Sequence, residues 1–260
     1  MNPPGPVCEV PQWPAPGSVS ALQTTRRGGV SSGPFDDGAG GGGCNLGHGE
    51  DEARAVSANR ALLRTRLPAE PGWLRQVHGT RIVDAALAGE GVQADGAFAV
   101  RPGLVCAVLV ADCLPVLLAD CKGRGVAAAH AGWRGLAAGV LQDCARSLRA
   151  AMGDPGAPLL AWLGPAIGPD RFEVGPEVLD AMRARLPEAR QAFREGRPGR
   201  LQADLFRLAR QALAQEGVEQ VFGGGRCTAS EPATFYSFRR DRTTGRQAAL
   251  IWLRSGAGGI

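Results

Sequence analysis

Histidine, cysteine and histidine stand at three similar places in the sequence, and these residue types can bind a metal or form a nucleophilic site. His78 and His130 each end an apolar stretch, and a glycine follows within two residues. Between them, Asp112 and Cys113 interrupt an otherwise apolar run over residues 104–119. Placing a carboxylate and a thiol in a buried strand costs free energy unless each finds a partner. We therefore expect the three segments to converge on one site.

Two kinds of chemistry fit this set of side chains. Two imidazoles and a thiolate are suitable ligands for a catalytic zinc site with one open coordination position, where a water becomes nucleophilic near neutral pH. Alternatively, Cys113 is the nucleophile, one histidine activates it, and Asp112 orients that histidine. The intervals of 35 and 17 residues between His78, Cys113 and His130 carry no metal-spacing signal. The residues alone leave both chemistries open.

Arginines near these positions could bind an anion. Arg134 follows His130 by four residues, in a glycine-flanked turn that leads into an expected helix, and a guanidinium beside helix amides suits phosphate. Arg239 belongs to a basic cluster near the C-terminus, with Arg240, Arg242 and Arg246. A general arginine bias is the alternative explanation of that cluster, because the chain has a single lysine.

Hydrophobic patterning predicts the elements that position these residues. Near-continuous apolar runs are typical of buried strands, and apolar residues spaced three and four apart are typical of helices. Strands and helices do not alternate strictly, which argues against a simple doubly wound sheet. The expected strands cover residues 18–25, 104–110, 115–119, 125–130, 159–163, 218–222, 234–238 and 248–253, with a hairpin from 73–78 and 81–85; the expected helices cover 50–67, 135–152, 176–185 and 201–216.

Composition indicates a globular protein without membrane or nucleic-acid partners. The chain has 260 residues, enough for one large domain, and its net charge of +4 is too small to indicate nucleic-acid binding by itself. The apolar run over residues 104–119 is shorter than a membrane span. Seven cysteines without a C-x-x-C pair fit a cytoplasmic protein with reduced thiols. We expect a flexible tail over residues 1–18 and a single catalytic domain over residues 19–260.

A series of short motifs then carries a family resemblance. In order, they are residues 76–79 (QVHG), 94–96 (ADG), 111–116 (ADCLPV), 130–135 (HAGWRG), 163–169 (LGPAIGP), 227–228 (CT), 236–241 (YSFRRD) and 244–246 (TGR). This series resembles the YfiH-type purine nucleoside phosphorylase family, also labelled laccase-domain or multicopper polyphenol oxidase, some members of which are called peptidoglycan editing factors. The resemblance covers about residues 24–253. The sequence departs from the family pattern at residues 45–51, which form a shortened stretch behind a glycine run at 38–43.

The resemblance implies a fold and a reaction. The fold is α+β, a single-domain layered α/β/β/α sandwich of mixed strands flanked by helices. The reaction is phosphorolysis of adenosine, inosine, guanosine or methylthioadenosine to the base and ribose 1-phosphate or methylthioribose 1-phosphate, with adenosine deamination as a second activity. The partners are therefore purine nucleosides and phosphate. The late strands have edges that could pair in a homodimer.

The resemblance implies a metal site, and the chemistry of the implied reaction suggests roles for its neighbours. The family's metal trio maps onto His78, Cys113 and His130, usually with zinc. On this basis Arg134, aided by Arg239, is the candidate phosphate clamp. Gln76 is a candidate hydrogen-bond partner of base or sugar. Asp112 is the candidate proton shuttle, or the partner that orients a ligand histidine.

Three other functions remain as alternatives. The first is a metal-free cysteine hydrolase acting on an amide of a cell-wall precursor, and the second is a binding or peptidoglycan-precursor editing module. Copper polyphenol oxidation is the least favoured, because a chain with three histidines cannot supply the imidazole-rich ligand set of a multi-copper cluster.

Overall fold

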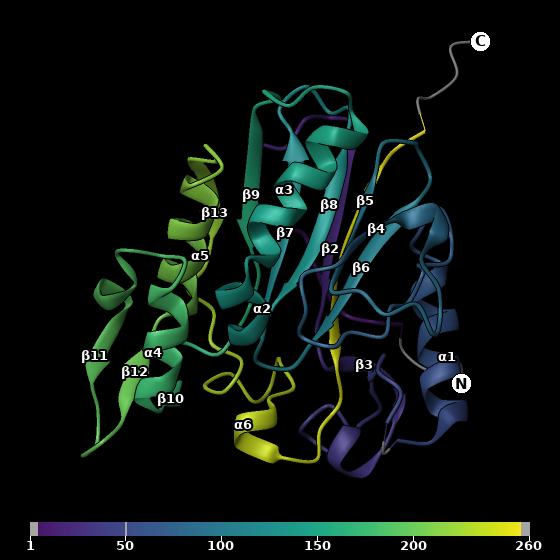
Figure 1. Cartoon of the computed structure of the whole chain (residues 1–260). Helices are drawn as coiled ribbons and strands as arrows, with labels where there is room; N and C mark the ends of the chain where they lie inside the picture. Colours follow the sequence, from purple (N-terminus) through teal and green to yellow (C-terminus); the bar gives the residue numbers. More distant parts are fainter. Residues whose placement is uncertain (1–4, 50, 256–260) are drawn as a thin grey trace.

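Two β-sheets packed face to face form the centre of the protein, and helices cover their outer faces (Figure 1). The computed structural model describes residues 5–49 and 51–255. The larger sheet has the strand order β13 (Gln220–Gly223), β9 (Leu159–Leu163), β7 (Leu114–Asp120), β8 (Val126–Ala131), β5 (Gly96–Ala99) and β4 (Ile82–Asp84). The smaller sheet has the order β1 (Cys8–Glu9), β2 (Val19–Thr24), β14 (Gln247–Leu253) and β6 (Val105–Val110).

Apolar layers on both sides of each sheet explain why the central strands are hydrophobic on both faces. On β7, Val116 and Leu118 pack against the helices, whereas Leu117 and Ala119 pack against the smaller sheet. A strand buried on both faces has no polar side, which is why it reads as a continuous apolar run. The predicted α+β layered α/β/β/α sandwich is therefore confirmed.

The helices occupy the two outer layers. The helix α1 (Ala53–Arg64) places Leu63 against the outer face of the smaller sheet. The outer face of the larger sheet is covered by α2 (Trp133–Ala138), α3 (Val140–Ala151), α4 (Pro176–Arg183) and α5 (Leu205–Ala214). The described helices include none that is both long enough and apolar enough to span a bilayer.

The remaining elements lie around this sandwich. Beside the helices of the larger sheet lies a small sheet with the order β10 (Glu173–Val174), β12 (Leu201–Ala203) and β11 (Phe193–Glu195). The others are β3 (Arg27–Ser31), α6 (Phe238–Asp241) and three 3-10 turns, Gly33–Phe35, Ala85–Leu87 and Ala189–Ala192.

Two predicted helices and one predicted strand differ in the structure. The expected helix over residues 135–152 is two helices, because Gly139 has a φ of 105° and separates α2 from α3. The expected helix over 201–216 begins only at Leu205, since residues 201–203 form β12 and Asp204 caps α5. The segment 234–238, expected as a strand, is irregular and leads into α6.

The predicted hairpin of residues 73–78 and 81–85 is wrong. Residues 73–81 form a loop that makes one isolated bridge, from Arg75 to Gln93, and only Ile82–Asp84 is a strand. Beyond that bridge, the side chains of Gln76 and Asp95 hold the loop, and hydrophobic alternation does not reveal such contacts. The predicted helix over 50–67 is confirmed as α1, although Glu50 lies outside the described residues.

The N-terminal arm, predicted as a flexible tail, runs along the smaller sheet where the structure describes it. Residues 8 and 9 form β1 and pair with β2. The backbone amide of Val7 donates to the carbonyl oxygen of Arg27, and that of Thr25 donates to the carbonyl oxygen of Val7. These bonds attach the arm from residue 7 onward to the body of the protein.

Candidate active site

His78, Cys113 and His130 come together at one point, as the sequence predicts. Their ligand atoms all lie within 4.8 Å of one another. The Cys113 Sγ is 3.8 Å from the His78 Nε2, and the two imidazole rings are 4.8 Å apart between centroids in an edge-on arrangement. In the described residues this is the one group of three or more such side chains close enough to share a metal ion.

The three side chains come from different kinds of segment. His130 lies near the end of β8, and Cys113 lies in the turn between β6 and β7. His78 lies in the loop over residues 73–81, with a φ of 60°. Gly132 allows these segments to meet, because a Cβ there would lie 2.8 Å from the His78 Cδ2 and 2.9 Å from the Cys113 Sγ.

Asp95 is the carboxylate that organises the two histidines, and it is fully buried. Its Oδ1 accepts hydrogen bonds from the His130 Nδ1 and from the backbone amide of His78, both at 2.9 Å. Its Oδ2 accepts from the amides of Val77 at 3.1 Å and Gly79 at 2.7 Å. Burial alone would raise the pKa of Asp95, but the hydrogen bonds from His130 and Gly79 outweigh it and lower the pKa.

This contact fixes which nitrogen of His130 faces the other two residues. With Nδ1 bonded to a carboxylate, Nε2 is the nitrogen available to a metal or to a thiolate. A carboxylate behind a ligand histidine is the usual outer partner of a metal site. In the sequence, Asp95 stands out only as part of the motif at residues 94–96, and its position as an acid directly before a buried strand is the one signal of its role.

Asp112 does not contact either histidine among the hydrogen bonds of the described residues. Its Oδ1 accepts from the Thr228 hydroxyl and its Oδ2 from the Arg239 amide, both at 2.6 Å. Asp112 has a φ of 92°, an unusual conformation for a residue other than glycine. The two contacts therefore hold a strained turn that directs Cys113 toward the histidines, while Asp95 takes the orienting position expected of Asp112.

The Cys113 thiol and the His130 imidazole shift each other's pKa. Burial would raise the pKa of Cys113, but the neighbouring His130 and His78 outweigh it and lower the pKa to about 6. Burial would lower the pKa of His130, but Cys113 and Asp95 outweigh it and raise the pKa to about 9. Near neutral pH the metal-free pair is therefore a thiolate beside an imidazolium, and the thiolate is also the form that binds metal.

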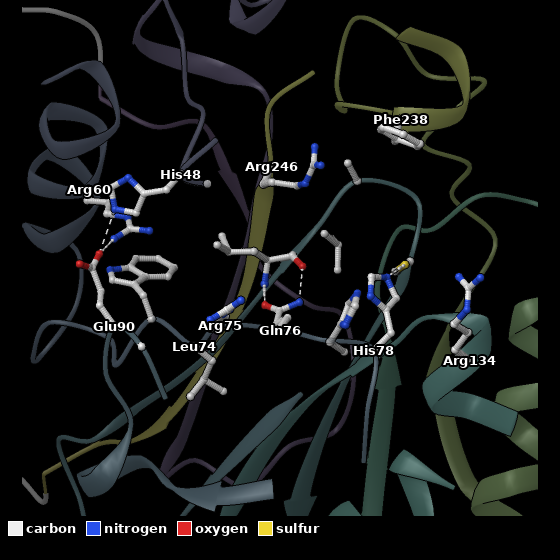
Figure 2. A pocket seen from close by; sticks show the side chains of 18 residues that line it. His48, Arg60, Leu74, Arg75, Gln76, His78, Glu90, Arg134, Phe238 and Arg246 are labelled. Carbon is white, nitrogen blue, oxygen red and sulfur yellow. Dashed lines mark hydrogen bonds and ion pairs between the residues drawn. The ribbon is translucent and has the colours of Figure 1, made fainter. Parts of the chain in front are cut away.

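A cavity of about 760 Å³, here called the main pocket, opens next to the trio (Figure 2). The side chains of Cys113, His78 and His130 line it, as do Gln76 and Arg134. Its volume lies within the range of small-molecule sites.

One end of the main pocket is lined by charged side chains. At the end away from the trio, Glu90 accepts hydrogen bonds from His48 and Arg60 (Figure 2). His48 and Arg60 also line the pocket. This contact therefore forms the far wall, and the trio forms the near one.

The predicted substrate-binding residues divide into three cases. Arg134 lines the main pocket, is exposed and packs over the Trp133 ring at 4.5 Å, and within residues 5–49 and 51–255 it makes no ion pair. Gln76 lines the pocket, but its amide exchanges hydrogen bonds with the backbone of Leu109 at 2.7 and 2.8 Å, so it anchors the loop of His78 (Figure 2). Arg239 points elsewhere, since its guanidinium donates to the carbonyl oxygen of Glu173.

Other residues of the pocket were not predicted as site residues. Arg75 and Phe238 line it, and Phe238 is 48% exposed although it is aromatic. Arg246, which the sequence places in a basic cluster and in the motif at residues 244–246, also lines it. Figure 2 shows Arg75 and Arg246 on one side of His78 and Arg134 on the other. An anionic substrate group could therefore meet a guanidinium on either side of the trio.

The donor set fits a divalent metal. Two imidazole nitrogens and a thiolate within reach of one another, with a carboxylate behind one imidazole, match zinc chemistry. Because the trio lines the pocket, a coordination position can face a substrate.

Similar sequences cover nearly the whole chain. The family described as multi-copper polyphenol oxidoreductase laccase matches residues 20–254. A purine nucleoside phosphorylase of Pseudomonas aeruginosa is 52% identical over 246 residues, which cover 94% of this chain and 97% of that protein. The purine nucleoside phosphorylase YfiH of Escherichia coli is 50% identical over 250 residues, covering 94% and 98%.

Solved structures give the same result. A Neisseria meningitidis protein superposes with a TM-score of 0.87 at 47% identity, covering 95% of this chain and 99% of that one. YlmD of Geobacillus stearothermophilus superposes with a TM-score of 0.82 at 34% identity, covering 92% and 93%. The chain therefore belongs to the family of the YfiH-type purine nucleoside phosphorylases, whose domain carries the laccase description.

Proposed function

We propose that this protein is a zinc-dependent purine nucleoside phosphorylase that acts in the cytoplasm. The observation that carries the proposal is the trio of His78, Cys113 and His130 at one side of a pocket large enough for a nucleoside. Relatives named as purine nucleoside phosphorylases, at about half identity along nearly the whole chain, support the same reaction class. Adenosine, inosine, guanosine and methylthioadenosine are the proposed substrates.

The reaction needs two kinds of assistance. Breaking a purine N-glycosidic bond places positive charge on the sugar and negative charge on the base, so an acid or a Lewis acid must face the base and a phosphate must approach the sugar. A zinc ion held by His78, Cys113 and His130 would supply Lewis-acid chemistry or an activated water. The same chemistry would support adenosine deamination as a side activity.

The residues of this chain supply binding and orientation. Arg134 is the proposed contact for phosphate, because its guanidinium lies in the main pocket beside the trio. Asp95 holds the imidazole of His130 and the loop of His78 in place. Asp112 serves as the proton-transfer residue only if its contacts with Thr228 and Arg239 open, and we therefore assign it a role in shaping the turn of Cys113.

The decisive experiment follows adenosine with and without phosphate by chromatography. We expect adenine and ribose 1-phosphate to form only when phosphate is present. We expect Cys113→Ala to lose both turnover and bound metal. Cys121→Ala is the matched control, because Cys121 is a partly exposed thiol that does not line the pocket. Phosphate-independent formation of inosine alone would contradict the phosphorylase assignment.

A metal-free cysteine hydrolase is the second candidate. The lowered pKa of Cys113 and the hydrogen bond between His130 and Asp95 form a cysteine–histidine–aspartate arrangement that could activate a nucleophile. Metal content separates the two functions: a hydrolase of this kind would be active without metal and inhibited by zinc. A copper oxidase is disfavoured, because the described residues hold one His/Cys/His group rather than a cluster of copper sites.

A further inference from the structure

Phe238 is an aromatic side chain that the fold leaves open to solvent in the main pocket. It is 48% exposed, and within residues 5–49 and 51–255 it is the one aromatic residue among the large hydrophobic side chains that are exposed. It is also the one member of that group that lines the main pocket. Exposed apolar side chains scattered singly over a surface need no explanation. An exposed aromatic ring inside a pocket does, because ligand sites are typically lined by aromatic groups.

The backbone on either side of Phe238 is fixed, which gives the ring a defined place. Before it, Ser237 is fully buried, and its hydroxyl caps the first turn of α6. After it, the amide of Arg239 donates to the Asp112 carboxylate at 2.6 Å. Because Asp112 directly precedes Cys113, the contact that shapes the turn of the thiol also holds the segment of Phe238. The ring and the trio both line the main pocket (Figure 2).

The ring of Phe238 is the one that a ligand can reach. The other Phe, Tyr or Trp side chain in the described lining of the pocket is Trp73. Trp73 is only 6% exposed, and the Arg60 guanidinium lies 4.5 Å from the centre of its ring, so the fold already covers it. The Arg242 guanidinium lies 6.0 Å from the centre of the Phe238 ring, at the outer limit of a cation–π contact. Phe238 therefore keeps an aromatic surface for a planar ligand.

We propose that Phe238 is the residue that recognises the purine base, which stacks on its ring. This role rests on the proposed phosphorylase function. A nucleobase has a π face that matches an aromatic side chain, and stacking tolerates different bases because each of them has such a face. The ring therefore accepts adenine, hypoxanthine and guanine alike, as the proposed range of substrates requires. It favours purines over pyrimidines, because a bicyclic base offers the larger π face.

The test is calorimetric titration of the full-length, metal-containing protein with inosine in the absence of phosphate. Inosine is then neither phosphorolysed nor deaminated, so its affinity is measured without turnover. We expect Phe238→Ala to bind inosine about tenfold more weakly, because the stacking contact is lost. The melting temperature should stay close to that of the native protein, because the ring is already half exposed. Leu87→Ala changes an exposed apolar side chain outside the main pocket, and this matched control should bind inosine normally.

Two further variants separate stacking from simple apolar contact. Phe238→Tyr keeps the aromatic ring and should bind inosine as the native protein does. Phe238→Leu keeps an apolar side chain without a π face and should bind as weakly as Phe238→Ala. With phosphate present, Phe238→Ala should raise the KM for inosine more than it lowers kcat, because the base is stacked before and during the reaction. Native affinity for inosine in Phe238→Ala or in Phe238→Leu would overturn the stacking role.

The same measurements separate this role from the proposed function. If Phe238→Ala loses inosine affinity but the native protein does not phosphorolyse inosine, base recognition by Phe238 stands and the phosphorylase function fails. If the native protein phosphorolyses inosine but Phe238→Ala binds it normally, the phosphorylase function stands and the role of Phe238 fails. A native protein that does not bind inosine would refute both.

Discussion

At the scale of single residues, one carboxylate determines the geometry of the site. Asp95 accepts four hydrogen bonds, one from the His130 ring and three from the backbone of the loop that carries His78. It therefore couples the position of one candidate ligand to that of the other. The sequence indicated His78, Cys113 and His130 as site residues but gave no role to Asp95. The contact between residues 95 and 130 depends on the pairing of β5 with β8, which the sequence pattern does not show.

Asp95→Asn should weaken metal binding more than it weakens the fold. The amide nitrogen replaces one carboxylate oxygen and cannot accept the two hydrogen bonds made there, and the neutral side chain no longer supports the imidazole, so we expect a roughly 10–100-fold loss of zinc affinity. Competition with a chromophoric chelator measures it. Asp170→Asn, which removes an exposed partner of Arg194, is the control and should bind zinc normally. Equal zinc affinity in both variants would show that Asp95 has no positioning role.

The metal-free protein should contain an unusually acidic thiol. Because the pKa of Cys113 is lowered to about 6, its thiolate forms as the pH rises through about 6 rather than through the ordinary value of 9.0. The raised pKa of His130 keeps the imidazole protonated up to about 9, so the thiolate–imidazolium pair exists between these values. The rate of alkylation by iodoacetamide, with Cys113→Ser subtracted, should therefore reach half of its plateau near pH 6. A midpoint at the ordinary pKa of a thiol would refute this ionisation state.

At the scale of elements, the site depends on how the chain leaves its strands. The ends of β8 and β6 deliver His130 and Cys113, and both strands are recognisable from their apolar runs. The loop that delivers His78 is not, because its position depends on the Gln76 amide docking on Leu109 and on Asp95. Hydrophobic periodicity indicates which residues of a helix or strand are buried, but it does not indicate which side chains hold a loop in place.

Gly139 is the corresponding feature among the helices. It ends α2 and precedes α3 with a φ of 105°, and this break turns the segment after Arg134 back onto the larger sheet. Gly139→Ala should lower the free energy of unfolding by about 1–3 kcal/mol, because a side chain is strained in that conformation. Denaturant titration measures the change. Gly89→Ala, at a glycine with no atom near the added Cβ, should unfold almost as the native protein does; an equal loss in both variants would contradict the strain argument.

At the scale of the whole molecule, the layers were predictable and the pockets were not. The two-sheet sandwich followed from the family resemblance, and most of its long strands followed from their apolar runs. The main pocket gathers residues as distant in sequence as Arg60, Cys113 and Arg246. Such neighbours are set by the pairing of β14 with β2 and β6, which no local pattern encodes.

The central claim is that one metal bound by His78, Cys113 and His130 is required for phosphorolysis. Its most direct test is a zinc titration of the metal-free protein, in which ribose 1-phosphate formation from adenosine and phosphate is measured at each step. We predict that activity rises in proportion to zinc and reaches its maximum at one equivalent per chain, and that Cys113→Ala neither binds zinc at this site nor gains activity. Full phosphorolysis in the protein without metal would contradict the account.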